Sequence, residues 1–144
     1  MDGGNPRPVR TGEVLGKGKV VLFAVPGAFT PGCSKIHLPG YLEHAEELKA
    51  KGVSTIACVA VNDPWVMDAW AEAHGATGTV VMLADGNAEF ARAMGLEVDL
   101  ATAGLGVRSQ RYAAIIEDGV FTSLEVEPGA GVDVSACSAL LAKL

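Results

Sequence analysis

Residues 25–40 read VPGAFTPGCSKIHLPG, and this stretch decides how the rest of the chain is interpreted. An apolar run over residues 20–25 leads into it, and helix-compatible residues follow Cys33. The pattern predicts a buried strand, a stiff loop rich in proline and glycine, and a helix whose first turn carries the cysteine. Backbone N–H groups at a helix start favour negative charge, so a thiol placed there ionises more readily than an ordinary one. We therefore expect Cys33 to be a nucleophile.

Outward from this stretch, apolar runs and turn residues alternate along the whole chain. We expect strands over residues 19–25, 53–61, 79–83, 112–116 and 120–126. We expect helices over 33–51 with a kink at Pro39 and Gly40, over 63–74 with Asp63 as N-cap, over 87–94, and from Ser135 to Leu144. Residues 1–18 are interpreted as an arm or short hairpin, and 101–106 as a loop.

This order of elements predicts a fold class. Strands that alternate with helices form parallel sheets covered on both faces, and the turn at Asp118-Gly119 adds an antiparallel hairpin. We expect one α/β domain over residues 1–144 with a thioredoxin-like fold, a central mixed sheet flanked by helices on both faces.

Composition excludes several classes of function. Apolar residues make up 49 % of the 144 residues and charged residues 19 %, as in globular proteins, and the net charge of −6 gives no electrostatic support for nucleic-acid binding. No apolar run approaches the roughly 18 residues of a membrane span. Residues 1–10 lack the apolar segment of a secretory signal. We expect a cytoplasmic protein with no membrane or nucleic-acid partner; an organellar targeting segment removed before residue 1 would leave no trace.

Three widely spaced cysteines without a C-x-x-C pair do not form a secreted disulfide framework, a zinc ribbon or a thioredoxin-type dithiol. His37 and His44 are seven residues apart, and His74 lies in another segment, so we expect no metal site. The glycine pairs at 16/18 and 104/106 fit neither a phosphate loop nor a dinucleotide fingerprint, so no cofactor site is expected.

Four residues are candidates to act with Cys33. Thr30 lies three residues before it and could turn its hydroxyl toward the sulfur. His37 lies four residues after it, on the same face of a helix. Arg108 and Arg111 precede an apolar strand, where an arginine needs an anion or a route to solvent, and Arg111 could reach the sheet end where Cys33 is expected.

The other two cysteines differ in context. Cys58 lies inside an apolar strand and is interpreted as structural, whereas Cys137 lies in the first turn of the last helix, a more accessible place. Two other functions compete with a redox role for Cys33. The first is a cysteine hydrolase using Cys33 and His37, although no Asn or Asp is identifiable as the third member. The second is a non-catalytic thioredoxin-like binding module.

The segments VPGAFTPGCSKIHLPGY, CVAVNDPWVMDAW, LADGNAEFARAMG and GLGVRSQRYA resemble signatures of the peroxiredoxins of the type II or type V group. The resemblance runs from about residue 8 to the C-terminus, and its core is the P-x-x-x-T-x-x-C pattern of Pro26, Thr30 and Cys33. It implies a thioredoxin-like fold.

The resemblance also implies roles. Cys33 matches the peroxidatic cysteine, Thr30 the threonine that bonds sulfur and peroxide, and Pro26 the proline that shields the cysteine from water. Arg111 matches the active-site arginine and Arg108 a supporting one. The implied activity is a thiol-dependent peroxidase that reduces hydrogen peroxide and small alkyl hydroperoxides through a cysteine sulfenic acid, without cofactor or metal.

The implied partners are thioredoxin or glutaredoxin with glutathione as reductant, and a second copy of the chain in a homodimer. Members of the group resolve the sulfenic acid with a cysteine near the C-terminus, with one near Cys58, or with an external thiol. Since a buried strand cannot move cheaply, we expect Cys137, reached through residues 128–131, to be the internal partner rather than Cys58.

Overall fold

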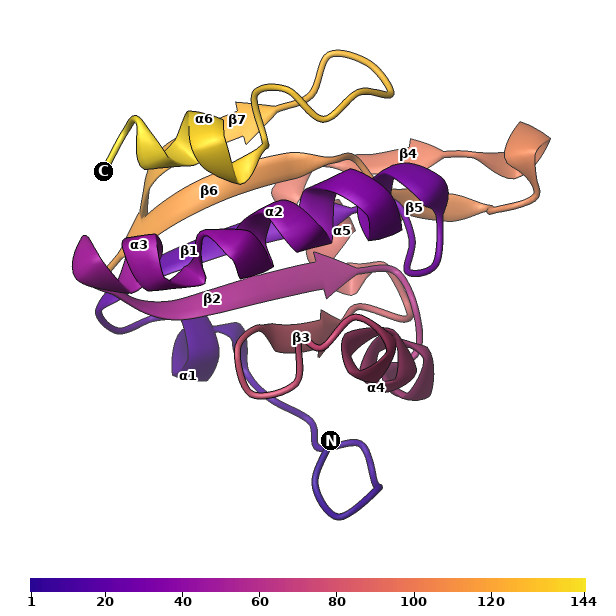
Figure 1. The fold of residues 1–144 in the computed structure, drawn as a ribbon. Helices are drawn as coiled ribbons and strands as arrows, with labels where there is room; N and C mark the ends of the chain where they lie inside the picture. The colour runs from indigo at the N-terminus through magenta and orange to yellow at the C-terminus, as the bar shows by residue number, and fades with distance from the viewer.

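The computed structural model describes all of residues 1–144 (Figure 1). The strands are β1 Lys19–Val25, β2 Val53–Ala60, β3 Val81–Ala84, β4 Glu97–Asp99, β5 Val107–Ser109, β6 Tyr112–Glu117 and β7 Val120–Val126. The helices are α1 Thr11–Leu15, a π-helix Cys33–His37, α2 Leu38–Glu43, α3 Ala45–Ala50, α4 Pro64–Ala73, α5 Glu89–Met94, a 3-10 turn Ala101–Ala103, and α6 Cys137–Leu141.

Five strands form one mixed sheet in the order β3-β2-β1-β6-β7. β1 pairs with β2 in parallel and with β6 antiparallel, and β7 returns from β6 as a hairpin through Asp118 and Gly119, both with positive φ. β4 and β5 form a separate two-stranded sheet. The mixed sheet agrees with the sequence-based expectation.

Helices cover both faces of the sheet because β1 is apolar at every other position on each face. Val21, Phe23 and Val25 pack in a cluster with residues of α2, α3, α4 and α6, and Val20, Leu22 and Ala24 pack on the opposite face near α1 and α5. Figure 1 shows α2 and α3 running along β1 and β2, with α6 beside β6 and β7. The predicted fold class is therefore confirmed.

Two predicted helix features are confirmed and one is wrong. Asp63 caps α4 by accepting the N–H of Val66 at 2.9 Å, and Pro64 occupies the first turn. Pro39 likewise lies in the first turn of α2, where a missing N–H costs little. Ser135 does not cap α6: Ala136 is the N-cap residue, and the Ser135 side chain is buried.

Other boundaries differ from the prediction. The segment expected as one kinked helix is broken again at His44, whose ring bonds the Gly40 carbonyl at 2.9 Å. Residues 1–18 contain a short helix, α1. The strands β4 and β5, which were not expected, lie on either side of the predicted loop over residues 101–106. β3 begins at Val81 rather than residue 79. These elements have three to five residues, too few for periodicity to reveal.

None of the helices has the length and apolar character that crossing a bilayer requires.

Candidate active site

Cys33 is the first residue of the π-helix, at the edge of the sheet where β1 ends. The N–H of Leu38 donates to the Cys33 carbonyl, an i→i+5 bond that widens this turn. The sulfur is buried, with no exposed surface on the residue. A buried thiol on a π-turn at a strand end is placed for chemistry, since π-turns concentrate at functional sites.

The side chain of Arg111 contacts this sulfur. It directly precedes β6, and the antiparallel pairing of β6 with β1 brings it to the end of β1 that leads to Cys33. Its Nη2 donates to the Cys33 Sγ at 3.3 Å, and its Nη1 lies 3.0 Å from the Nδ1 of His37. A guanidinium carries a permanent charge and five donors in a rigid fork, so one group serves both partners.

His37 uses both ring nitrogens for structure. Because arginine can only donate, Nδ1 of His37 must accept from Arg111, and its Nε2 then carries the proton and donates to the Ser135 carbonyl at 2.9 Å. Burial lowers the pKa of His37 to about 4; the Ser135 carbonyl opposes this and the nearby Arg111 charge adds to it. The imidazole is therefore neutral at pH 7, with its tautomer fixed.

This arrangement bears on the cysteine hydrolase alternative. A Cys/His hydrolase needs the imidazole to accept the thiol proton. Here neither ring nitrogen of His37 is bonded to the sulfur, because Arg111 and Ser135 occupy both. The hydrolase interpretation is not favoured, and His37 acts on Cys33 only through Arg111.

The loop before Cys33 is held by hydrogen bonds from distant segments. Arg108 donates from Nη1 to the Pro26 carbonyl at 3.2 Å and from Nε to the Leu105 carbonyl at 2.8 Å. The side chain of Asn62, just after β2, accepts the N–H of Ala28 at 2.9 Å. Arg108 thus touches the loop and not the sulfur, a placement that suits a supporting residue. Asn62 was missed from the sequence because it lies 34 residues from its partner.

Thr30 faces the loop itself. Its hydroxyl donates to the Gly27 carbonyl at 2.6 Å, so this proton is not available to the sulfur. The Oγ1 lone pairs stay available as acceptors. A Cβ on Gly27 would lie 2.9 Å from Nη1 of Arg108 and 3.1 Å from Cγ2 of Thr30, which explains why glycine is needed at that close approach.

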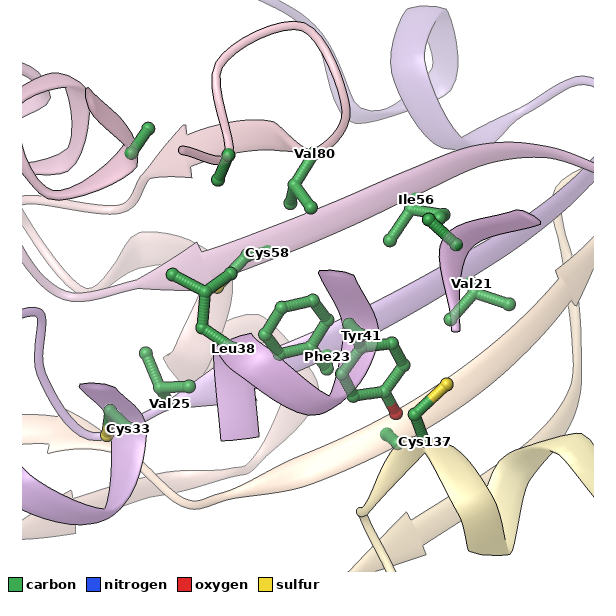
Figure 2. Packing of buried hydrophobic residues seen from close by; sticks show 14 of the residues in the cluster. Val21, Phe23, Val25, Cys33, Leu38, Tyr41, Ile56, Cys58, Val80 and Cys137 are labelled. Atoms are coloured by element: carbon green, nitrogen blue, oxygen red, sulfur yellow. The ribbon is translucent and has the colours of Figure 1, made fainter. Parts of the chain in front are cut away.

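All three cysteines are free and buried, which corrects the expectation that Cys137 is accessible. Cys137 is only 2 % exposed, because the short helix α6 turns this side chain into the core, and burial raises the pKa of its thiol to about 12. Figure 2 shows Cys33 and Cys137 at separate ends of the buried cluster, with the rings of Phe23 and Tyr41 between them. Cys58, in the middle of β2, is fully buried, and burial raises the pKa of its thiol well above the ordinary value.

The site also contains three residues that sequence reasoning did not assign to it: Ser135 in the last loop, Tyr41 in α2 and Phe23 in β1. The Ser135 carbonyl accepts from Tyr41 Oη at 2.8 Å as well as from His37. Tyr41 stacks on Phe23 with ring centroids 4.1 Å apart, and Phe23 also packs against His37 at 5.0 Å. The only sequence signal for these contacts was the serine that had been interpreted as a helix cap.

Comparisons with known proteins identify a family for this chain. The family model described as Redoxin matches residues 2–141. The rice protein Peroxiredoxin-2E-2, chloroplastic, is 50 % identical over 98 % of this chain, which spans 64 % of that relative's length. Peroxiredoxin-2B of Arabidopsis thaliana is 49 % identical over 88 % of this chain and 78 % of its own.

A solved structure agrees as well. Reduced Prx3 of Vibrio vulnificus in complex with H2O2 is 57 % identical, with a TM-score of 0.87 over 92 % of this chain and 84 % of that one. The Redoxin model matches nearly all residues, and these relatives are about half identical over most of this chain. The chain therefore belongs to the peroxiredoxin family, within the thioredoxin-like redoxins.

Proposed function

We propose that this chain is a thiol-dependent peroxidase that reduces hydrogen peroxide and small alkyl hydroperoxides, with Cys33 as the peroxidatic residue. The observation that carries the proposal is the 3.3 Å bond from Arg111 Nη2 to the buried Cys33 sulfur. A relative of 57 % identity has been solved with H2O2, which supports the same substrate class here.

The proposed step is an in-line displacement at oxygen. The Cys33 thiolate attacks one peroxide oxygen, an S–O bond forms and the O–O bond breaks, and hydroxide or alkoxide leaves and takes up a proton. Sulfur is oxidised to the sulfenic acid while the peroxide is reduced. Arg111, already at the sulfur, stabilises the charge that spreads over both oxygens in the transition state.

We assign Thr30 to orienting the substrate. Its own proton goes to Gly27, so its Oγ1 can only accept, and the group it fits is the O–H of a hydroperoxide. We assign Pro26 to shielding the sulfur, and Arg108, bonded to the Pro26 carbonyl, to supporting the loop.

A second thiol then condenses with the sulfenic acid, releasing water and forming a disulfide that an external dithiol reduces. We propose thioredoxin, or glutaredoxin with glutathione, as the source of those electrons, and Cys137 rather than Cys58 as the internal thiol.

Two relatives, from rice and Arabidopsis thaliana, are named as chloroplastic proteins; for this chain a cytoplasmic location stays a prediction.

The test is peroxide consumption with a dithiol reductant by wild type, Cys33→Ser and Cys58→Ser proteins. The proposal requires activity in the wild type, loss in Cys33→Ser and near-normal activity in Cys58→Ser. A non-catalytic thioredoxin-like module would consume no peroxide in any of them.

A further inference from the structure

Glu127, the residue after β7, has a buried carboxylate that lies beyond the residues that touch the sulfur. Its Oε2 accepts the Ser135 hydroxyl at 2.5 Å, the Ser135 N–H at 2.8 Å and the Asp133 N–H at 2.7 Å, and its Oε1 accepts the Val134 N–H at 3.4 Å. Four donors from three consecutive residues thus converge on one side chain. The loop between β7 and α6 is fastened by this carboxylate.

No cation pairs with Glu127: the ion pairs of the structure involve other acids. Burial opposes ionisation of this carboxyl, but the hydrogen bonds from Ser135, Asp133 and Val134 outweigh it and hold its pKa below the ordinary value. The charge is therefore satisfied only by the loop that it holds. Removing the carboxylate would leave these donors without their partner, and the loop would lose its fixed position.

The same residues close a ring of hydrogen bonds around the site. The Glu127 N–H donates to the Arg111 carbonyl at 2.9 Å, and the Glu127 carboxylate holds Ser135. The Ser135 carbonyl accepts from His37 Nε2, and His37 Nδ1 accepts from Arg111. Arg111 is thus connected to Glu127 through its backbone and, by way of Ser135 and His37, through its side chain.

We propose that Glu127 is a positioning residue for peroxide reduction, an inference that rests on the proposed function. It holds the Ser135 carbonyl where that carbonyl fixes His37 as the tautomer with a free Nδ1 lone pair. That lone pair takes Arg111 Nη1 and thereby aims Nη2 at the Cys33 sulfur. Without the carboxylate, His37 can turn or change tautomer, and a protonated Nδ1 would face the guanidinium donor to donor.

The first measurement is the single-turnover rate constant for oxidation of Cys33 by hydrogen peroxide in Glu127→Gln and Ser135→Ala. Ser135→Ala is the milder variant, because it removes one hydroxyl and leaves the carbonyl that bonds His37. It tests the same route if Glu127→Gln does not fold. The matched control is Glu125→Gln, two residues earlier on β7, which loses the 2.7 Å ion pair to Lys143 beyond α6 but touches neither Ser135 nor His37. We expect roughly a tenfold fall in Glu127→Gln, a smaller fall in Ser135→Ala, and a control unchanged. A control that falls equally would mean general loosening of the C-terminal segment and would overturn the proposal.

The second measurement separates positioning from stability. In a His37→Ala background, Glu127→Gln should have almost no further effect on the rate constant, because its influence passes through the imidazole. Independent, multiplicative effects of the two substitutions would contradict the proposed route.

The third measurement does not depend on peroxidase activity. Nitrogen-15 shifts of the His37 ring should report a protonated Nε2 and bare Nδ1 in the wild type, and a mixture of tautomers in Glu127→Gln. An unchanged tautomer in that variant would overturn the proposal even if the rate fell. If the wild type consumed no peroxide, the proposed function would fail by itself, while the ring spectra would still decide whether Glu127 positions His37.

Discussion

Arg111 and Cys33 are 78 residues apart in sequence, yet a guanidinium N–H of Arg111 donates to the buried sulfur of Cys33 at 3.3 Å. The second arm of the same guanidinium is held by His37 at 3.0 Å. Because His37 holds Nη1, the guanidinium already points Nη2 at the sulfur. In the proposed reaction the charge would not need to reorient when peroxide binds, and such preorganised donors lower the activation barrier.

The first prediction follows from these two arms. Arg111→Ala should lower the second-order rate constant with peroxide roughly 10²-fold or more, with the fold retained, because the transition-state charge loses its donor. Arg111→Lys should recover only part of the rate, since one ammonium lacks the fork that meets His37 and Cys33 together. Stopped-flow measurements with hydrogen peroxide test this, and an unaltered rate constant in Arg111→Ala would make the arginine structural.

The second prediction concerns acid. The pKa of His37 falls from 6.5 to about 4 on folding. Between these two pH values the imidazole is protonated in the unfolded chain and neutral in the folded one. Stability is therefore lost as the pH falls from 6.5 toward 4, by about 3 kcal/mol for a shift of this size. Urea unfolding at pH 7 and pH 4.5 should show this loss in the wild type and a smaller one in His37→Gln. Equal losses in the two proteins would assign the acid sensitivity to other groups.

A third prediction rests on the close approach at Gly27. Gly27→Ala places a Cβ 2.9 Å from Arg108 Nη1 and 3.1 Å from the Thr30 methyl, so the loop before Cys33 must shift. We expect peroxidase activity to fall by roughly tenfold while the protein remains folded. Gly40→Ala is the control, because its Cβ meets no atom within 4 Å. Activity in Gly27→Ala equal to that of the control would show that the loop tolerates the displacement.

The fourth prediction concerns the internal disulfide. Figure 2 shows the rings of Phe23 and Tyr41 between Cys33 and Cys137, and both cysteines are buried. A disulfide needs Cα atoms within about 7 Å and a clear path between the two sulfurs. A Cys33–Cys137 bond therefore requires α6 and the start of the π-helix to unwind. Peptide mapping after one equivalent of peroxide should find that bond; a Cys33–Cys58 bond, or no intramolecular bond, would refute Cys137.

The fifth prediction is association. Phe29 and Ile36, on the loop and helix that carry Cys33, are 56 % and 58 % exposed, and Trp65 at the start of α4 is 58 % exposed. A contiguous patch of large exposed apolar side chains commonly marks an interface. We expect a homodimer in equilibrium with monomer, weakened by Phe29→Ser and Ile36→Ser. Sedimentation that finds only monomer at high micromolar concentration would exclude it.

Sequence reasoning predicted the central sheet and the approach of Arg111 to Cys33, because both follow from where the apolar strands begin and end. Buried strands such as 19–25 are continuous apolar runs, and the alternation of strands with helices predicts parallel pairing. Cys33 and Arg111 lie at strand ends, and strands that share a sheet edge bring their ends together.

The role of the last loop could not be predicted in the same way. Glu127 and Ser135 lie in a stretch of polar and glycine residues that is typical of exposed loops, and the contacts of Ser135 to His37 and Tyr41 span more than 90 residues. Nothing in composition distinguishes a buried loop carboxylate from a solvated one. Cys137 was misjudged because α6 has only five residues, too few for its apolar face to stand out.

The burial of Cys137 has a consequence for how electrons reach the oxidised protein. An internal thiol that is shut in the core can act only as fast as the C-terminal segment opens, so its chemistry is timed by a local unfolding event. Under the proposal that Cys137 is the internal thiol, an external dithiol competes with this opening for the same sulfenic acid. The dominant route would then be set by how often α6 opens and by the reductant concentration, so a change in the reductant supply would change it.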